Sequence, residues 1–193
     1  MTTHLSTTEI ESRLGAAGAS PRDDGKLDRI VCRPERGERQ LLDSAELDLT
    51  AGLVGDNWKV RGSKDTPDGS ANFDAQITLA NSRVIDAMAS DQEMWPLAGD
   101  QLYVDFDISI DNLPPGQQIA IGSVILEVST KPHTGCAKFT ERFGHDAIRM
   151  VNSKEGLHQR WRGVNTRIVQ PGTIHIGDVI HKVELKMGET ETV

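Results

Sequence analysis

The chain has 193 residues and a formal net charge of −8, with 37% hydrophobic and 4% aromatic residues. This acidic balance lacks the clustered positive charge of sequence-independent nucleic-acid binding, and few aromatic rings are available for stacking on bases. No stretch approaches the roughly 18 consecutive apolar residues of a membrane-spanning helix, so no membrane segment is expected.

The N-terminal residues predict a short helix over 6–14. Ser6 and Glu9 have the spacing of a capping box, and Gly15 and Gly18 favour an end to the helix. We expect this helix to be an appendage to the main fold. The predicted division is therefore an N-terminal extension at 1–26 and one domain at 27–193.

The same N-terminal residues bear on localisation. Residues 1–24 include Glu9 and Glu11 and no apolar core, unlike a signal peptide or an acid-poor transit peptide. Two cysteines, Cys32 and Cys136, are too few for a disulfide framework and suit a reducing compartment. We expect a cytoplasmic protein.

The next elements alternate strands with loops. Residues 27–33 predict a strand that ends before Pro34, and the Gly- and Asp-rich residues 52–72 predict a long surface loop. A short strand is expected at 77–79. A helix over 83–89, capped by Asn81 or Ser82, is expected after it.

The second half is richer in strands. Residues 102–110 alternate apolar and polar side chains, which predicts a half-buried strand. The remaining expected elements are strands over 119–128, broken at Gly122-Ser123, a loop over 130–136, a helix over 146–152, and strands over 164–169 and 174–185. The fold class is mostly β with a few short helices (α+β).

A weak internal repeat favours a barrel. Residues 121–128 resemble residues 176–183, and residues 98–104 form a looser third copy. Each copy places a Gly-Ser or Gly-Asp corner before a strand, where glycine permits a positive φ. We interpret Asp100 and Asp178 as corner residues rather than functional carboxylates, because aspartate bonds readily to nearby backbone.

Cys136 lies in the densest group of reactive side chains. Five basic residues fall within nine positions of it, and positive charge favours the reactive thiolate. These residues are Lys131, His133, Lys138, Arg142 and His145. An inert packed thiol is the alternative for Cys136, and core packing is the expected role of Cys32.

Two other clusters are candidates for ligand binding. A zinc site at His133, Cys136, His145 and His158 would not match the spacings of common zinc modules. Arg160, Arg162 and Arg167 would frame an anion pocket if they folded beside Cys136. The alternative for this arginine cluster is a solvated basic stretch.

Several motifs in order resemble the MOSC domain, the C-terminal domain of molybdenum cofactor sulfurases. The resemblance covers roughly residues 27–185, and its strongest part runs from Cys136 to Asp178. The motifs are Gly-Leu-Val-Gly-Asp at 52–56, Gly-Cys-Ala-Lys-Phe at 135–139, Arg-Phe-Gly at 142–144, Arg-Gly-Val-Asn-Thr-Arg at 162–167, Pro-Gly-Thr-Ile at 171–174 and Ile-Gly-Asp at 176–178.

The resemblance implies a MOSC-type β-barrel that binds the molybdenum cofactor (molybdopterin) or carries sulfur. Cys136 matches the cysteine that is proposed to hold a persulfide or to ligate molybdenum, and a thiolate suits both tasks. The residues expected to help bind the cofactor are His133, Lys138, Arg142, Arg162, Asn165 and Arg167. Gly135 stands where cofactor-binding relatives often have proline. No pyridoxal phosphate is expected, because the chain has no room for the second domain of full sulfurases.

Two alternatives remain open at this point. One is a molybdenum-dependent reductase of N-hydroxylated compounds, which would need a separate electron donor. The other is a non-catalytic binding module in which Cys136 only packs. Expected partners are a small-molecule cofactor or a protein that donates or accepts sulfur, with no nucleic acid and no membrane.

Overall fold

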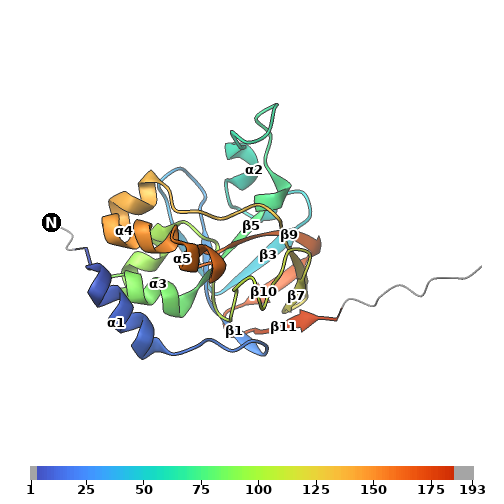
Figure 1. The fold of residues 1–193 in the computed structure, drawn as a ribbon. Coiled ribbons are helices and arrows are strands. Elements are labelled where there is room, and N and C mark those ends of the chain that lie inside the picture. Colours follow the sequence, from blue (N-terminus) through green and yellow to red (C-terminus); the bar gives the residue numbers. More distant parts are fainter. Residues whose placement is uncertain (1–3, 185–193) are drawn as a thin grey trace, which may run out of the picture.

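A closed β-barrel forms the centre of the fold in a computed structural model that describes residues 4–184 (Figure 1). The predicted strand end at Leu185 and the end of the predicted domain at Val193 lie outside the described residues. Around the barrel the order is β1 (Gly25–Cys32), β11 (Val179–Val183), β7 (Gln118–Ile121), β8 (Val124–Val128), β9 (Val164–Gln170), β5 (Ile77–Asn81) and β6 (Leu102–Asp105).

β1 closes the barrel because it pairs with three different strands along its length. Gly25 and Lys26 pair with β11, and the register with β6 shifts between Leu27 and Arg29. The far end of β1 pairs with β2 (Gln40–Leu42). β5 and β6 form the parallel pair, while the other pairings within this sheet are antiparallel. A barrel of this kind leaves few free strand edges.

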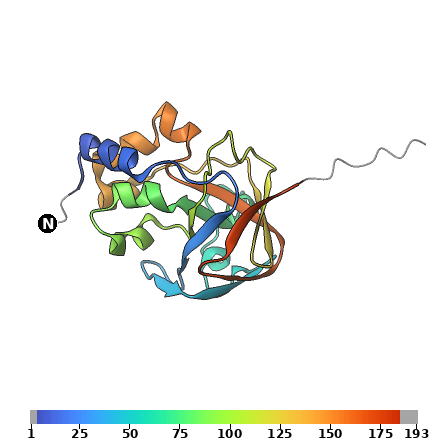
Figure 2. The same cartoon turned by 90° about the horizontal axis from the view of Figure 1, so that it is seen from below.

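A smaller sheet and several helices complete the fold. The small sheet has the order β10 (Gly172–His175), β3 (Ser44–Asp48), β4 (Gly52–Leu53). The helices are α1 (Thr7–Ala17), α2 (Trp58–Arg61), α3 (Ser82–Met88), α4 (Ala137–Val151) and α5 (Lys154–His158), with 3-10 helices η1 (Phe73–Ala75) and η2 (Gln92–Ala98). In both views α1, α3, α4 and α5 gather on one side of the barrel (Figures 1 and 2).

Two hydrophobic clusters follow from this layering. The barrel interior is filled by aliphatic side chains such as Leu27, Val104 and Ile180. The second cluster lies between the barrel wall and the helices, and includes Tyr103 and Phe143. Strands covered by helices are therefore buried on both faces.

This second cluster explains why β6 differs from its predicted form. The alternation at 102–110 predicted a half-buried strand, but Leu102, Tyr103 and Val104 are all buried. Tyr103 points toward the helices, where its hydroxyl donates to the Trp95 carbonyl. The strand ends at Asp105, and the following residues continue without regular structure.

α1 is packed into the fold and is not an appendage. Its predicted capping box is confirmed, because the Glu9 amide donates to Ser6 Oγ and the Ser6 amide donates to Glu9. Ile10 is fully buried in the helical cluster, and the Thr7 amide donates to Asp146 on α4 at 2.9 Å. The extension predicted at 1–26 thus contributes to the same core as the barrel wall.

The loop expected at 52–72 also contains ordered structure. β4 and α2 lie within it, and Leu53 and Trp58 are buried. Trp58 meets Phe73 edge-on with ring centroids 5.2 Å apart. α2 and the segment after it stand out from the rest of the molecule (Figure 1).

The helix predicted at 146–152 begins much earlier. α4 starts at Ala137 and is interrupted at Gly144, which has a non-helical backbone with φ +92°. The loop predicted at 130–136 is confirmed, and Cys136 lies at its junction with α4. Because the helix is interrupted at Gly144, the sequence pattern did not predict its first two turns.

The repeated glycine corners are confirmed, and they give a matched test. Gly122 and Gly177 both have positive φ, +56° and +92°. A Cβ on Gly122 would lie 2.7 Å from the Thr173 carbonyl oxygen and 2.5 Å from an Asp178 carboxylate oxygen, whereas one on Gly177 would meet nothing within 4 Å. We expect Gly177→Ala to lower the free energy of unfolding by about 1–2 kcal/mol from backbone strain alone, and Gly122→Ala to lower it further. Urea unfolding measures both, and equal losses would contradict the steric argument.

Candidate functional site

A basic pocket opens between the β1–β2 connection, α2 and the first turns of α4. Its volume is about 870 Å³, within the range of small-molecule sites. Six cationic side chains line it, and the carboxylates in its wall are Glu35 and Asp56. The cationic residues are Arg33, Arg36, Arg39, Arg61, Lys138 and Arg142. Cys136 belongs to the same wall and is exposed.

Arg33 and Asp56 form a buried ion pair in the floor of this pocket. One Asp56 oxygen accepts from the Arg33 amide and Nε at 2.9 and 2.8 Å. The other accepts from Arg33 Nη2 and the Trp58 amide, both at 2.9 Å. Arg33 Nη1 also donates to the Gly99 carbonyl at 2.7 Å. The pair thus fastens the end of β1 to α2 and to the residue that precedes Asp100.

Arg39 and Arg142 both line the pocket and donate to adjacent carbonyls of η2. Arg39 Nε donates to the Pro96 carbonyl at 2.9 Å, and Arg142 Nη1 donates to the Leu97 carbonyl at 2.6 Å. Burial lowers the pKa of Arg39, and the charges of Arg142 and Arg33 lower it further. The pKa of Arg61 is lowered for the same reasons, burial first and then the charge of Arg33. These cations repel one another, so an anion among them would be stabilised.

Cys136 stands at the N-terminal end of α4, where its backbone is extended. The preceding residue is fixed from the C-terminal end of α4, because the Gly135 amide donates at 2.9 Å to the side chain of Asn152, the residue that follows the helix. A Cβ at Gly135 would lie 2.8 Å from Ile148 Cδ1 and 3.0 Å from Val151 Cγ2. The close packing against α4 therefore gives a physical reason for glycine before this cysteine.

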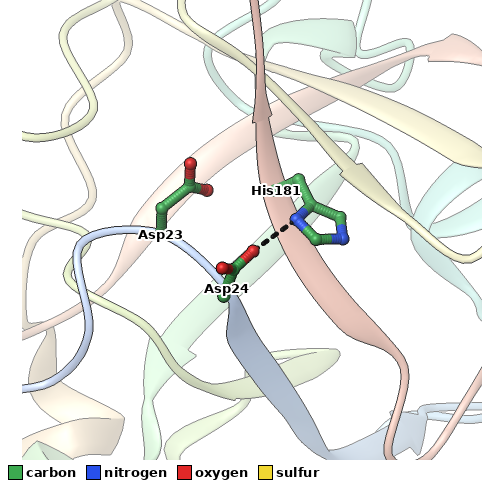
Figure 3. A group of neighbouring side chains, drawn as sticks. All are labelled: Asp23, Asp24 and His181. Carbon is green, nitrogen blue, oxygen red and sulfur yellow. Dashed lines mark ion pairs between the residues drawn. The ribbon is translucent and has the colours of Figure 1, made fainter.

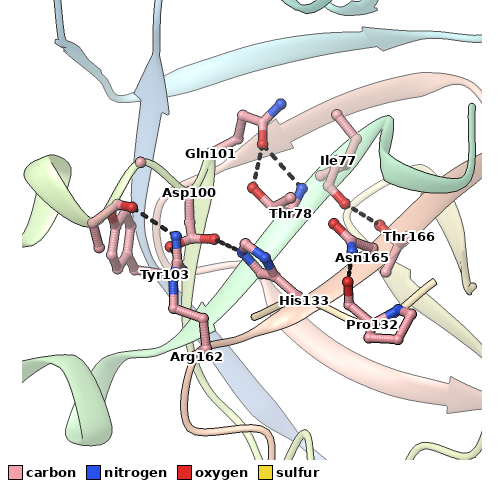
Figure 4. Close-up of polar contacts among 12 residues, drawn as sticks. Ile77, Thr78, Asp100, Gln101, Tyr103, Pro132, His133, Arg162, Asn165 and Thr166 are labelled. Carbon is pink, nitrogen blue, oxygen red and sulfur yellow. Dashed lines mark hydrogen bonds and ion pairs between the residues drawn. The ribbon is translucent and has the colours of Figure 1, made fainter. Parts of the chain in front are cut away.

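A buried polar network includes His133, from the loop that precedes Cys136 (Figure 4). Asp100 is fully buried and accepts from His133 Nε2 and from Arg162 Nη1, both at 2.7 Å. Arg162 Nη2 donates to the Ala98 carbonyl at 2.8 Å. The interpretation of Asp100 as a corner residue is therefore wrong, because its carboxylate joins two distant segments. That of Asp178 is confirmed, since it accepts from the His175 amide in its own turn.

Burial and the Arg162 guanidinium determine the protonation states of this network. Burial alone would raise the pKa of Asp100, but the Arg162 guanidinium and the hydrogen bonds from His133 and Arg162 hold it well below its usual range. Burial lowers the pKa of His133, and the charge of Arg162 lowers it further. A neutral His133 that donates from Nε2 to the Asp100 carboxylate satisfies both groups.

The residues predicted as a site fall into three places. Cys136, Lys138 and Arg142 line the pocket, while His133 and Arg162 belong to the buried network behind it. Asn165 is buried and donates to the carbonyls of Lys131 and Pro132, so it supports the loop. Arg167 is exposed, pairs with Glu127 at 2.6 Å and is not part of the pocket wall.

Sequence reasoning missed the arginines of the N-terminal half. Arg33, Arg36 and Arg39 are spaced by three residues directly after a strand, and this spacing was the available signal. Arg61 comes from α2, inside residues 52–72, for which the sequence predicts a surface loop. Their charges are the reason that an acidic protein has a basic pocket.

The histidines considered as zinc ligands do not lie together in a group that could hold a metal ion. Among residues 4–184, the one group of three side chains close enough to hold a metal ion is Asp23, Asp24 and His181 (Figure 3). All three are exposed, and Asp24 pairs with His181 Nδ1 at 2.7 Å. Cys136 is not a member, and none of the other histidines is.

Comparison with known proteins identifies the class. The model of the MOSC domain family matches residues 54–181, which is more than half of the chain. The chain therefore belongs to the MOSC domain family, and its predicted fold class is confirmed. No curated protein matches the chain.

Solved structures show the same fold at low sequence identity. The YuaD protein from Bacillus subtilis aligns with a TM-score of 0.59 and 16% identity, over 83% of this chain and 97% of that one. YiiM from Escherichia coli aligns with a TM-score of 0.55 and 17% identity, over 83% and 70%. YiiM from Geobacillus stearothermophilus gives 0.55 and 13%, over 85% and 77%. In the described part of this chain, no helix has the length and apolar character needed to cross a bilayer.

Proposed function

We propose that this MOSC protein binds the molybdenum cofactor, an anionic pterin phosphate, in the basic pocket, with Cys136 as the thiolate at its rim. The observation that supports this proposal is the convergence of six cationic side chains and one exposed cysteine on a single cavity. The reducing cytoplasm, where both cysteines remain thiols, is the compartment that suits this chemistry.

The residues present fit such a ligand. Arg39 donates from Nε and Nη1 to the carbonyls of Pro96 and Glu38, and Arg142 donates from Nη1 to the Leu97 carbonyl. The remaining N–H groups of both side chains, Nη2 of Arg39 among them, are left for phosphate oxygens. Lys138 adds a further charge one residue into α4. A thiolate is a soft ligand of the kind that suits a molybdenum centre.

The chain's own residues would bind and orient the ligand. Arg39, Arg61 and Arg142 would neutralise the phosphate, and the Arg33–Asp56 pair would keep the pocket floor rigid. A bound molybdenum centre would supply redox chemistry. A reductase activity on N-hydroxylated compounds would then need electrons from a separate donor protein.

A sulfur carrier is the second candidate. Its support is the exposure of Cys136 at the pocket rim, which leaves the thiol within reach of a partner protein. In that case the thiolate takes the outer sulfur of a donor persulfide, and the donor leaves as a thiolate. The pocket cations would steer an anionic acceptor to the same place.

Metal analysis tests the proposal on protein purified from a host that makes the cofactor. We expect about one molybdenum and one pterin per chain in the wild type, and loss of molybdenum in Cys136→Ser. Arg142→Gln is expected to weaken cofactor retention about 10-fold or more, because it removes a charge-assisted hydrogen bond donor.

Arg167→Gln is the matched control, because Arg167 is an exposed arginine outside the pocket wall. It should retain the cofactor like the wild type. Absence of molybdenum and pterin from the wild type would contradict cofactor binding. Persulfide on Cys136, read by mass spectrometry of the same samples, would then support the sulfur carrier.

A further inference from the structure

Asp100 is a fully buried carboxylate whose partners all come from other parts of the chain. It follows the left-handed Gly99 just before β6, and it bonds His133 in the Cys136 loop and Arg162 before β9. Burying a carboxylate costs free energy even when it is paired, so a hydrophobic core would be served as well by an apolar residue. Its presence calls for a role beyond packing.

The segment that Asp100 holds has no regular backbone structure. Residues 129–136 contain no helix or strand, and Pro132, Thr134 and Cys136 are exposed. Side chains fix the loop from beneath: Asn165 bonds the carbonyls of Lys131 and Pro132, and Asp100 bonds His133. Of these three hydrogen bonds, only the one from His133 is made to a buried charged group, the Asp100 carboxylate.

Asp100 is also linked, through Arg162, to the helix that follows Cys136. Arg162, which Asp100 holds at 2.7 Å, lies over the Phe139 ring with its guanidinium carbon 5.0 Å from the ring centroid. Phe139 belongs to the first turn of α4. Asp100 is thus linked to the residue three positions before Cys136 and to the residue three positions after it.

We propose that Asp100 is a positioning residue for Cys136. By holding His133 directly and Phe139 through Arg162, it keeps the thiol in the wall of the basic pocket. This inference rests on the proposed function, in which Cys136 acts beside the pocket cations. Loss of the carboxylate charge is expected to loosen His133 and Phe139 on the two sides of Cys136, while Gly135 stays bonded to Asn152, and to let the thiol shift away from those cations.

Two alkylating reagents measure the position of the thiol. Iodoacetate is an anion and iodoacetamide is neutral, so the ratio of their rates at Cys136 reports how close the thiol lies to the cations. The rates are followed by mass spectrometry of the Cys136 peptide, which separates this site from the buried Cys32. A small unstructured thiol peptide supplies the reference ratio.

We expect the wild-type ratio to exceed the peptide ratio by roughly 10-fold, and Asp100→Asn to lower it about threefold or more. His133→Leu keeps the Asp100–Arg162 pair and is expected to lower the ratio as well, so the test stands even if Asp100→Asn does not fold. Asp105→Asn is the matched control, because Asp105 lies on β6 shortly after Asp100 and its pair with Arg83 is outside the pocket wall. It should lower thermal stability and leave the ratio unchanged.

The outcomes separate this inference from the proposed function. A wild-type ratio equal to that of the peptide would overturn the basic setting of Cys136 and therefore both proposals. An elevated wild-type ratio that persists in Asp100→Asn and in His133→Leu would overturn the positioning role alone. A drop in Asp105→Asn as large as in Asp100→Asn would also overturn it, because general loosening would then explain the effect.

Discussion

Asp56→Asn is expected to lower the free energy of unfolding by about 3–5 kcal/mol, the usual loss when one partner of a buried ion pair is removed. Each Asp56 oxygen accepts two hydrogen bonds, from Arg33 on one side and from Arg33 Nη2 and the Trp58 amide on the other. An amide nitrogen in place of either oxygen would face two donors, so the isosteric change cannot be accommodated by a flip. Arg33 would remain buried without its counter-charge.

Urea unfolding checks this expectation, with Asp105→Asn as the control. Asp105 forms a similar two-pronged pair with Arg83, but both side chains are partly exposed, at 26% and 35%. Water can replace much of that interaction, so the expected loss is about 1 kcal/mol. Similar losses in the two variants would contradict the claim that burial of the Arg33–Asp56 pair sets its contribution.

The positions of the seven barrel strands could be predicted largely from local pattern, whereas β2, β3 and β4 were not predicted. The glycine corners at Gly122 and Gly177 marked real barrel turns, because positive φ is a local requirement. The capping box at Ser6 was readable for the same reason. The pattern did not show that helices cover the outer face of β6, because burial of that face depends on tertiary packing.

The candidate site was predictable only in part. Cys136 was identified from the cations near it in sequence, and Lys138 and Arg142 do line the pocket. Arg33 and Arg61 were not found, because they are brought to Cys136 by the closure of β1 and by α2. No local rule joins residues about a hundred positions apart.

Asp100 illustrates a second limit of the sequence. A Gly-Asp pair before a strand has a sufficient local explanation in turn chemistry, and that explanation is correct for Asp178. The two aspartates differ in burial and in the residues that face them. Asp100 faces Arg162 and His133 inside the protein, whereas Asp178 is half-buried and bonds its own turn. The role of each aspartate is decided by its burial and by its contacts with distant residues, and the sequence shows neither.

Arg162→Met is expected to lower the free energy of unfolding by about 3–5 kcal/mol at pH 8, and by less at pH 5.5. Methionine keeps apolar contact with Phe139 but leaves Asp100 without its guanidinium and the Ala98 carbonyl without its donor. At pH 8 the variant must hold an uncompensated buried carboxylate beside a neutral histidine. This is the larger part of the expected loss.

The pH dependence follows from the proton affinity of the Asp100–His133 pair. In the wild type the pKa of His133 lies below its ordinary 6.5, so stability from the neutral ring is present above that pH and falls as the pH drops. In the variant the repulsion from Arg162 is gone, and the pair binds a proton more tightly than the unfolded chain does. A raised pKa adds stability below the unfolded value, so the variant gains as the pH falls.

Both effects reduce the difference in unfolding free energy between the wild type and Arg162→Met as the pH falls. The expected reduction is about 1 kcal/mol or more between pH 8 and pH 5.5. Urea unfolding of the two proteins at both pH values measures it, and titrations elsewhere cancel because both proteins share them. Arg167→Met is the control: its exposed pair with Glu127 should change stability by no more than about 0.5 kcal/mol at either pH. A loss in Arg162→Met that is the same at both pH values would mean that the buried carboxylate is not what the arginine stabilises, and that its stacking on Phe139 is the main contribution instead.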